Sequence, residues 1–232
     1  VRTVEGRRTT RRPPPPYTTA TLQQDASRKL RLSAKQAMDA AQALFEAGLI
    51  TYHRTDSVRV GDEAAAEARA WIAAHHPEAL PDAAPQARVG GGAQDAHEAI
   101  RPTRPDADVQ PPAGAAARLY ALIRASQSRA AAFDRTTVWI DSGPVAWAAE
   151  GAVLREPGFL VFWGPYARQE DVVLPAVVPG QRLRVDDLRV HERATTPPPR
   201  YDQGALIQAL ERLGIGRPAT FASIIETLLR RE

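Results

Sequence analysis

The chain has 232 residues, a hydrophobic fraction of 44% and a formal net charge of +3 at pH 7. It contains no cysteine, which excludes disulfide bonds and thiolate metal sites such as zinc ribbons. No apolar run approaches the ~20 residues that a membrane-spanning helix needs, so we expect no membrane partner. The 20 prolines favour several segments joined by turns over one regular helical bundle.

The N-terminal part of the chain predicts a proline spacer followed by two helices. Residues 1–12 are polar and basic with weak strand character, and the four prolines 13–16 form a stiff spacer. A helix is expected from Thr18 to Leu30. The next helix opens at the capping box Ser33-Ala34-Lys35-Gln36 and runs to the stop at Gly48.

The stretch that follows is also expected to be mostly helical. Residues 62–75 and 113–132 predict two long helices, since they are rich in alanine and carry apolar side chains at helical spacing. Residues 77–92 between them are rich in Pro, Gly and Ala and predict an exposed loop. The glycines at 90–92 lack the Lys that follows a phosphate-binding glycine loop, so we interpret them as linker.

The pattern changes after Phe133 from helical spacing to short apolar runs split by Gly and Pro. Such runs predict a small β unit. The expected strands are 136–140, 145–149, 159–163, 172–174, 183–185 and 188–191. After a second proline spacer, residues 203–213 and a segment whose first turn holds Pro218 predict two helices. They are joined by a tight glycine turn, as in a helix-turn-helix.

The run Ile50-Thr51-Tyr52-His53-Arg54-Thr55-Asp56-Ser57 places a tyrosine hydroxyl among polar and cationic side chains. In an extended segment side chains two apart share a face, so Tyr52 and Arg54 would point one way and His53 and Thr55 the other. A phenol beside a fixed cation can attack a phosphodiester, because the cation stabilises the developing negative charge. The alternative is a strand with a half-buried tyrosine and a solvated arginine.

Together with three other segments, this run resembles the type IA DNA topoisomerases, and bacterial topoisomerase I most closely. The other segments are Pro15 to Ser27, Ala93 to Thr103, and Pro197 to Tyr201 followed by Gly214 to Ile225. The segments occur in the family's order, and the resemblance covers the chain nearly from end to end.

The resemblance implies an α+β multidomain fold, the toroidal gate of these enzymes. Residues 17–134 would form a helical domain that carries the tyrosine, similar to the family's domain III. Residues 1–16 and 135–198 would form the small β-strand arch into which it is inserted, similar to domain II. Residues 199–232 would begin a helical, helix-turn-helix-like domain that binds single-stranded DNA, similar to domain IV.

By its place in the motif, Tyr52 matches the family's catalytic nucleophile, and Arg54 matches the catalytic arginine that positions the scissile phosphate. The resemblance implies transient cleavage of one DNA strand through a 5′-phosphotyrosine bond, then strand passage and religation. The intact enzyme would relax negative supercoils without ATP, because the covalent bond conserves the energy of the phosphodiester.

Four further residues are DNA-binding candidates by the same resemblance. His97 corresponds to a histidine that contacts DNA phosphate, although a lone histidine is more often a structural hydrogen-bonding group. Arg217 and Thr220 resemble residues that line the groove for single-stranded DNA. Arg101 belongs to the motif of His97, but Arg101 and Glu98 could instead form an ion pair that holds the loop.

The family's Mg²⁺ site lies in an N-terminal Toprim domain, and we expect it outside this chain. Asp106-Ala107-Asp108 is an Asp-X-Asp, but no strand precedes it, and we predict no metal site here. We therefore expect a gate fragment that lacks relaxation activity by itself. Its partners would be single-stranded or underwound DNA and the Toprim domain, and we expect a cytoplasmic, nucleoid-associated monomer.

Two alternatives stay open. The first is the topoisomerase portion of a reverse gyrase. The segment Leu49 to Ser57, with His after the Tyr, resembles the tyrosine segment of that enzyme. The Pro-Pro-Pro-Arg-Tyr segment favours topoisomerase I instead. The second is a non-catalytic DNA-binding module that reuses the fold. A Tyr52→Phe variant with unchanged behaviour in every assay would favour the second alternative.

Overall fold

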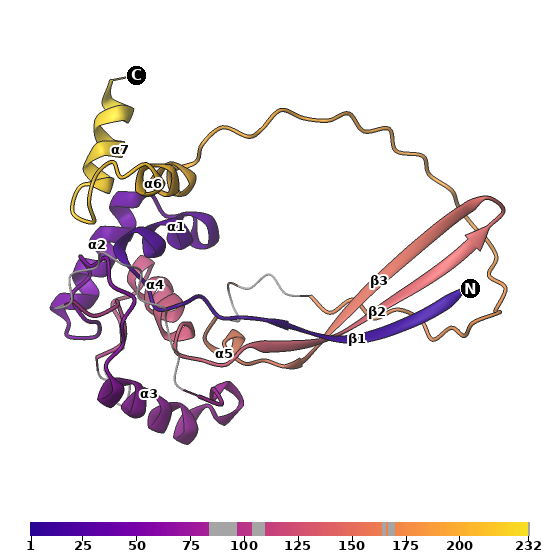
Figure 1. Ribbon diagram of the computed structural model, residues 1–232, viewed down its shortest axis with the longest axis horizontal. Coiled ribbons are helices and arrows are strands. Elements are labelled where there is room, and N and C mark those ends of the chain that lie inside the picture. The colour runs from indigo at the N-terminus through magenta and orange to yellow at the C-terminus, as the bar shows by residue number, and fades with distance from the viewer. Residues whose placement is uncertain (84–96, 104–109, 164–165, 167–169, 232) are drawn as a thin grey trace. The chain divides into compact units, whose positions relative to one another are not determined.

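The computed structural model describes residues 1–83, 97–103, 110–163, 166 and 170–231, which form an α+β fold (Figure 1). The chain divides into two compact units. The helical unit comprises residues 12–130, 157–168 and 201–232, and the sheet unit comprises residues 1–11, 131–156 and 169–200.

Capping residues define the first helices of the helical unit. Thr18 and Thr21 form a capping box at the start of α1, and Ser33 and Gln36 form another at the start of α2. In each box two otherwise unpaired backbone N–H groups are satisfied. The helices are α1 (Thr19–Leu30), α2 (Ala34–Glu46), α3 (Asp62–His75), α4 (Ala115–Ala125), α5 (Leu160–Trp163), α6 (Gln203–Arg212), α7 (Phe221–Arg230) and the 3₁₀ turn η1 (Pro77–Ala79).

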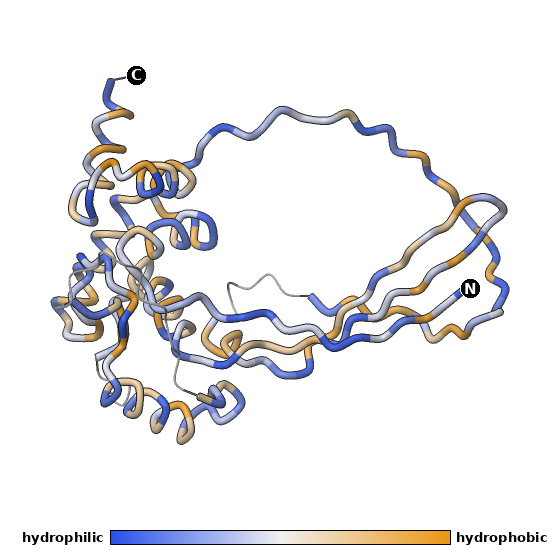
Figure 2. The backbone as a smooth tube through the Cα atoms, in the orientation of Figure 1, coloured by the Kyte–Doolittle hydropathy of each residue, from blue (hydrophilic) through white to orange (hydrophobic). Residues whose placement is uncertain are grey.

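Helices α6 and α7 pack against α1 and α2. The tube in Figure 2 alternates between orange and blue along α7, because one face of this helix is apolar. Hydrogen bonds join Gln24 to Glu211 and Arg28 to Gln208 at the edge of the contact. The buried residues that share this core are Ala20, Ala34, Ile207, Leu210, Phe221 and Ile225.

The sheet unit contains three antiparallel strands in the order β1-β2-β3 (Thr3–Arg11, Ala131–Ser142 and Val145–Glu156). The register places Thr3 opposite Trp139 and Arg11 opposite Ala131. Val138 is buried, whereas most of the sheet's charged side chains are exposed.

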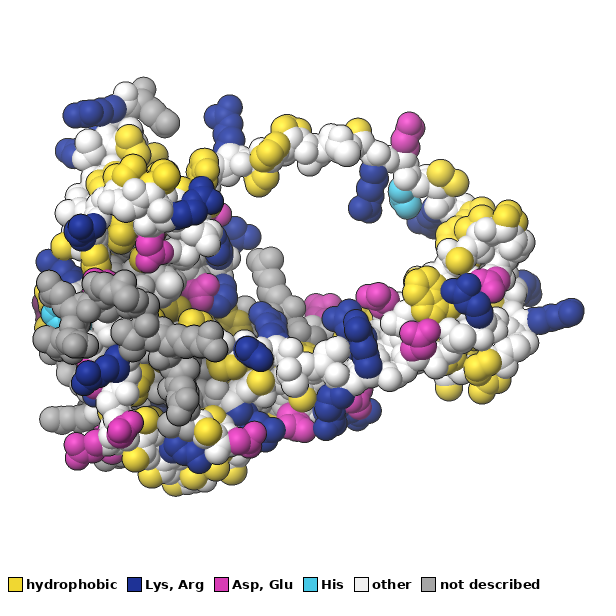
Figure 3. Space-filling view, viewed as in Figure 1, with side chains coloured by type: hydrophobic (Ala, Val, Ile, Leu, Met, Phe, Trp, Pro, Cys, Tyr) yellow, Lys and Arg dark blue, Asp and Glu magenta, His cyan; other side chains and the backbone are white. Residues whose placement is uncertain are grey.

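Charged side chains of the sheet pair across its strands. Asp134 accepts hydrogen bonds from Arg155 Nε at 2.8 Å and from Arg8 Nε at 3.4 Å. The bond from Arg155 is the main cause that lowers the pKa of the Asp134 carboxyl. Figure 3 shows basic and acidic side chains close together over this sheet. Because these groups are exposed, their ion pairs add little to the stability of the sheet.

Several predicted elements are confirmed. Helix α1 differs by one residue from the predicted helix, α3 has the predicted bounds, and α2 ends just before Gly48. The helix predicted at 113–132 is too long, since α4 ends at Ala125. There Ser126 donates its hydroxyl hydrogen to the carbonyl of Ile123, and the chain tightens into 3₁₀-type turns before β2.

The strand predicted at 159–163 is wrong, because this run forms the helical turn α5. Gly158 lies at φ +49°, and a Cβ there would come within 2.4 Å of the Ala130 carbonyl oxygen. The chain therefore reverses sharply, and Phe159 and Trp163 are buried on a single turn. A short apolar run does not distinguish a strand from a buried helical turn.

Other expected strands also differ from the structure. Val172 forms only an isolated bridge with Ala152, and the described residues at 183–185 and 188–191 form no strand. Residues 3–11, in contrast, form the complete strand β1. Pro218 lies in the turn before α7 and not within its first turn. The division into a helical domain, a two-part arch and the start of a DNA-binding domain stays a prediction. Among the described helices, none combines the length and apolar character needed to cross a membrane.

Candidate active site

The segment after α2 presents alternate side chains to opposite sides. The side chains of Tyr52, Arg54 and Asp56 are exposed, with Tyr52 at 47%, whereas His53 and Thr55 are buried. This alternation is the one predicted for an extended segment. It places the phenol and the guanidinium on the solvent side, where a polymeric substrate can reach both.

Thr51 joins this segment to the loop that carries His97. Its N–H donates to the carbonyl of Arg101 at 3.0 Å, and its hydroxyl donates to the carbonyl of Ala99 at 2.7 Å. The same hydroxyl oxygen accepts from the Arg101 N–H at 3.0 Å. Ile50 and Pro102 form a bridge beside these bonds. Thr51 is thus fixed to the loop that carries His97, more than 45 residues away in sequence.

Aromatic contacts orient the ring of Tyr52. The ring meets Phe45 edge to face at 5.5 Å between centroids, and it lies 5.4 Å from the ring of His53. Phe45 comes from the last turn of α2. Edge-to-face packing of this kind fixes the orientation of a ring. The ring is therefore positioned from one side while about half of the residue stays accessible.

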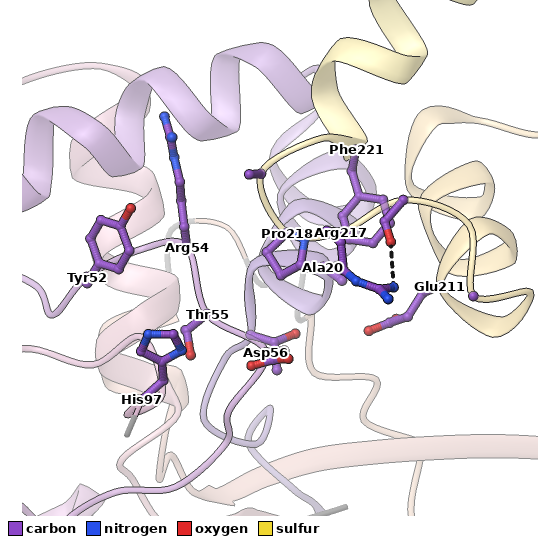
Figure 4. Close-up of a pocket in the computed structure, with 14 residues that line it drawn as sticks. Ala20, Tyr52, Arg54, Thr55, Asp56, His97, Glu211, Arg217, Pro218 and Phe221 are labelled. Atoms are coloured by element: carbon purple, nitrogen blue, oxygen red, sulfur yellow. Dashed lines mark hydrogen bonds between the residues drawn. The ribbon is translucent and has the colours of Figure 1, made fainter. Parts of the chain in front are cut away.

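A pocket of about 730 Å³ brings together residues from three distant motifs, all within the helical unit. Tyr52 and Arg54 project into it from the same segment, His97 lies below Tyr52 and beside Thr55 in the view, and Arg217 enters from the turn before α7 (Figure 4). Its lining therefore contains two guanidinium groups and an imidazole beside one phenol. Such a set suits an anionic substrate such as a phosphodiester.

Arg101 and Thr220 are not among the residues that line this pocket. Arg101 forms an ion pair with Glu98, with 2.6 Å between Nη2 and Oε2. The hydroxyl oxygen of Thr220 accepts a hydrogen bond from the N–H of Arg217 at 2.8 Å. Both residues therefore support residues that line the pocket. Arg101 holds the loop that carries His97, and Thr220 holds the backbone of Arg217.

Two acidic residues of the pocket had not been predicted, Asp56 and Glu211. Asp56 could have been found, because it is two residues beyond Arg54 on the exposed side of the same segment. Glu211 gives no such signal, since it lies on α6 and reaches the site only through the packing of α6 on α1. It accepts a hydrogen bond from Gln24 Nε2 at 3.1 Å.

His53 is buried directly behind the pocket-lining segment, with 1% of its surface exposed. Burial lowers the pKa of its imidazole, and the charge of Arg54 lowers it further, while Glu46 opposes them. Its Nδ1 finds no hydrogen-bond partner among the described residues. The neutral imidazole is the form that such an apolar site favours.

The described residues do not contain an acidic cluster suited to Mg²⁺. No group of three or more His, Asp or Glu side chains there is arranged to hold a metal ion. Magnesium requires several oxygen ligands in octahedral geometry, so the residues present do not fit it. Asp106 and Asp108 lie outside the described residues.

Comparison with known proteins identifies one family throughout. The family model described as DNA topoisomerase matches residues 1–232. The DNA topoisomerase 1 of Vibrio cholerae is 40% identical over 238 residues, covering 98% of this chain and 27% of that protein. The DNA topoisomerase 1 of Mycobacterium tuberculosis is 39% identical over 241 residues, covering 93% of this chain and 26% of that protein.

A solved structure agrees with these matches. The full-length topoisomerase I of Thermotoga maritima superposes with a TM-score of 0.74 and 30% sequence identity, over 99% of this chain and 40% of that chain. The chain spans only about a quarter of the length of the curated relatives named above.

Proposed function

The chain belongs to the DNA topoisomerase family, in its bacterial type IA branch, and from this premise we propose that it is the DNA-cutting gate segment of such an enzyme. The observation that carries the proposal is the shared pocket of Tyr52, Arg54, His97 and Arg217. These four residues come from three separate motifs, and each is of a type that phosphodiester cleavage by a tyrosine needs.

In the proposed reaction the Tyr52 oxygen forms a bond to the phosphorus of one DNA strand. The bond from phosphorus to the 3′ oxygen breaks, and the phenol proton passes to that oxygen directly or through water. The product is a 5′-phosphotyrosine and a free 3′-hydroxyl. Attack by that hydroxyl reverses every bond change, so religation needs no ATP.

The cationic residues would act on the phosphate in this reaction. Arg54, beside Tyr52, would position the scissile phosphate and stabilise its extra negative charge in the transition state. His97 would contact a phosphate oxygen near the same point. Arg217, on the opposite wall of the pocket, would hold the strand by a backbone contact, which is expected to be sensitive to salt.

We further propose that Mg²⁺ is supplied by a Toprim domain outside this chain, since the described residues do not fit the ion. The ion would neutralise phosphate charge when bound. Passage of a strand would require the helices that carry Tyr52 to separate from α6 and α7, and the sheet unit would act as the arch that permits it. We also propose that the enzyme acts as a monomer in the cytoplasm, at the nucleoid, where its DNA substrate is found.

Covalent capture on labelled single-stranded DNA with Mg²⁺ tests the proposal. The protein is assayed as the chain alone, as the chain with a separately produced Toprim domain, and as the full-length enzyme, each beside its Tyr52→Phe variant. We expect a Tyr52-dependent adduct from the full-length enzyme and none from the chain alone. A full-length enzyme whose adduct survives Tyr52→Phe would refute the role of this tyrosine.

Two further outcomes would distinguish the proposed function from its alternatives. An adduct from the chain alone would contradict the placement of the acidic half of the site outside it. No adduct in any arm, with salt-sensitive DNA binding retained, would favour a non-catalytic binding module.

A further inference from the structure

Two adjacent threonines at the start of α1 have different roles in the structure. Thr18 caps the helix through Thr21, as described above. Thr19 is the first helical residue, is fully buried and does not line the pocket. Its hydroxyl is therefore not needed for capping and has no direct access to a substrate.

The hydroxyl of Thr19 joins the two peptide groups on either side of Arg54. It donates to the carbonyl of His53 at 2.8 Å, with the carbonyl of Thr55 as a more distant acceptor at 3.1 Å. Its oxygen accepts from the N–H of Thr55 at 2.9 Å. The Thr19 N–H also donates to the carbonyl of Thr55 at 2.9 Å. A hydroxyl has one donor and two acceptor sites, and here it uses both functions on the backbone that flanks a single residue.

These bonds matter because the segment belongs to no sheet. Apart from the bridge at Ile50, the described residues of the segment form no strand ladder that would fix the register. In an extended chain, a shift by one residue turns every side chain to the opposite face. The bonds from Thr19 hold Arg54 on the pocket side and leave His53 and Thr55 buried.

We propose that Thr19 is a positioning residue for Arg54, and through Arg54 for the phosphate that Tyr52 attacks. The inference rests on the proposed function, since it assumes that Arg54 acts on the scissile phosphate. It assigns a reaction role to a residue that never touches the substrate. A misplacement of about 1 Å at a reacting group can lower a rate on the order of 100-fold.

The test uses single-turnover adduct formation by the full-length enzyme. Thr19→Val keeps the shape but removes the hydroxyl, whereas Thr19→Ser keeps the hydroxyl. Thr19→Ala is made in parallel in case valine disrupts the fold. The matched control is Ser126→Ala, since Ser126 is also buried but its hydroxyl bonds only to near neighbours in sequence: it donates to the Ile123 carbonyl and accepts from Gln127 Nε2.

We expect Thr19→Val to slow adduct formation by about 10- to 100-fold and Thr19→Ser to stay within about threefold of the parent. In an Arg54→Ala background, Thr19→Val should slow the reaction by less than about twofold, because the residue that it positions is gone. Ser126→Ala should lower the unfolding temperature without changing the rate.

The inference is overturned if Thr19→Val and Thr19→Ala both leave the rate unchanged, or if the Thr19→Val effect has the same size without Arg54. It is also overturned if Ser126→Ala, at an equal loss of stability, slows the reaction as much as Thr19→Val does. The slower rate would then follow from lower stability of the fold and not from the position of Arg54. Failure of the proposed function looks different, because the unmodified enzyme would then form no Tyr52-dependent adduct, and both conclusions would fall.

Discussion

Arg101 and Glu98 form an ion pair in the loop that carries His97, with side chains only 16% and 32% exposed. The second carboxylate oxygen of Glu98 accepts the N–H of Gly61 at 3.1 Å, just before α3 begins. The pair therefore connects the His97 loop to the start of that helix. The structure thus provides Arg101 with a partner inside the protein.

Replacing Arg101 by methionine should lower the free energy of unfolding by about 1–2 kcal/mol, because Glu98 would keep a half-buried charge without its partner. The salt dependence of binding to single-stranded DNA should hardly change. Arg217→Met should leave the free energy of unfolding nearly unchanged. It should reduce the slope of log affinity against log salt concentration by about 0.7. Thermal unfolding and a salt titration of DNA affinity measure both effects. A reduced slope without loss of stability in Arg101→Met would instead support direct DNA contact.

Arg54→Lys should slow adduct formation by about 100-fold while changing affinity for single-stranded DNA by less than about threefold. Lysine keeps the charge but loses the planar, two-pronged contact that a guanidinium makes with a phosphate. Single-turnover capture and fluorescence anisotropy separate the two quantities. Arg59→Lys is the control, since Arg59 is exposed nearby but does not line the pocket. Equal losses in both variants would argue against a specific role for Arg54.

His53 should make the protein less stable in mild acid. Burial and Arg54 lower the pKa of its imidazole below the ordinary 6.5, so the unfolded chain takes up a proton more readily than the folded one. The contribution of neutral His53 is complete above about pH 6.5 and is lost as the pH falls toward the lowered value. Urea unfolding of the parent and of His53→Met across this range measures it.

The difference in unfolding free energy between the parent and His53→Met should shift against the parent as the medium becomes acidic. His75→Asn is the control for replacing a histidine, because His75 is exposed and lies on α3, away from this site. A constant difference across the range would contradict the burial argument for His53.

Gly216→Ala should destabilise the helical unit by about 1 kcal/mol more than Gly214→Ala. Both glycines have positive φ, +84° and +69°, so alanine is strained at either position. A Cβ at Gly216 would also lie 3.0 Å from Ile224 and 3.3 Å from Phe221, whereas nothing lies within 4 Å at Gly214. Denaturant unfolding compares the two variants directly, and equal losses would show that the contacts of Gly216 relax freely.

Local patterns carried the successful predictions from sequence. A capping box is complete within four residues, so the start of α2 at Ser33 could be predicted without knowledge of the fold. The exposure of Tyr52 and Arg54 on one side followed from the two-residue period of an extended chain. Both depend only on neighbouring residues.

The remaining features depend on contacts between distant residues. Glu211 lies in the pocket because α6 packs on α1, and its partner Gln24 is 187 residues earlier in the chain. The helical turn at Phe159 follows from the close approach of Gly158 to Ala130. Neither contact has a signature in its own segment. The ion pair of Arg101 with Glu98 was one of two possibilities from sequence, but the bond from Gly61 to Glu98 joins residues 37 apart.

The pairing of β1 with β2 has a consequence for how the protein is made. Thr3 pairs with Trp139, so the first strand leaves the ribosome long before its neighbour has been translated. During that interval its backbone N–H and C=O groups are unpaired, while α1 and α2 can already form from local contacts. The strand Thr3–Arg11 is polar and rich in arginine. Such charged side chains disfavour pairing with other nascent chains while the strand is still unpaired.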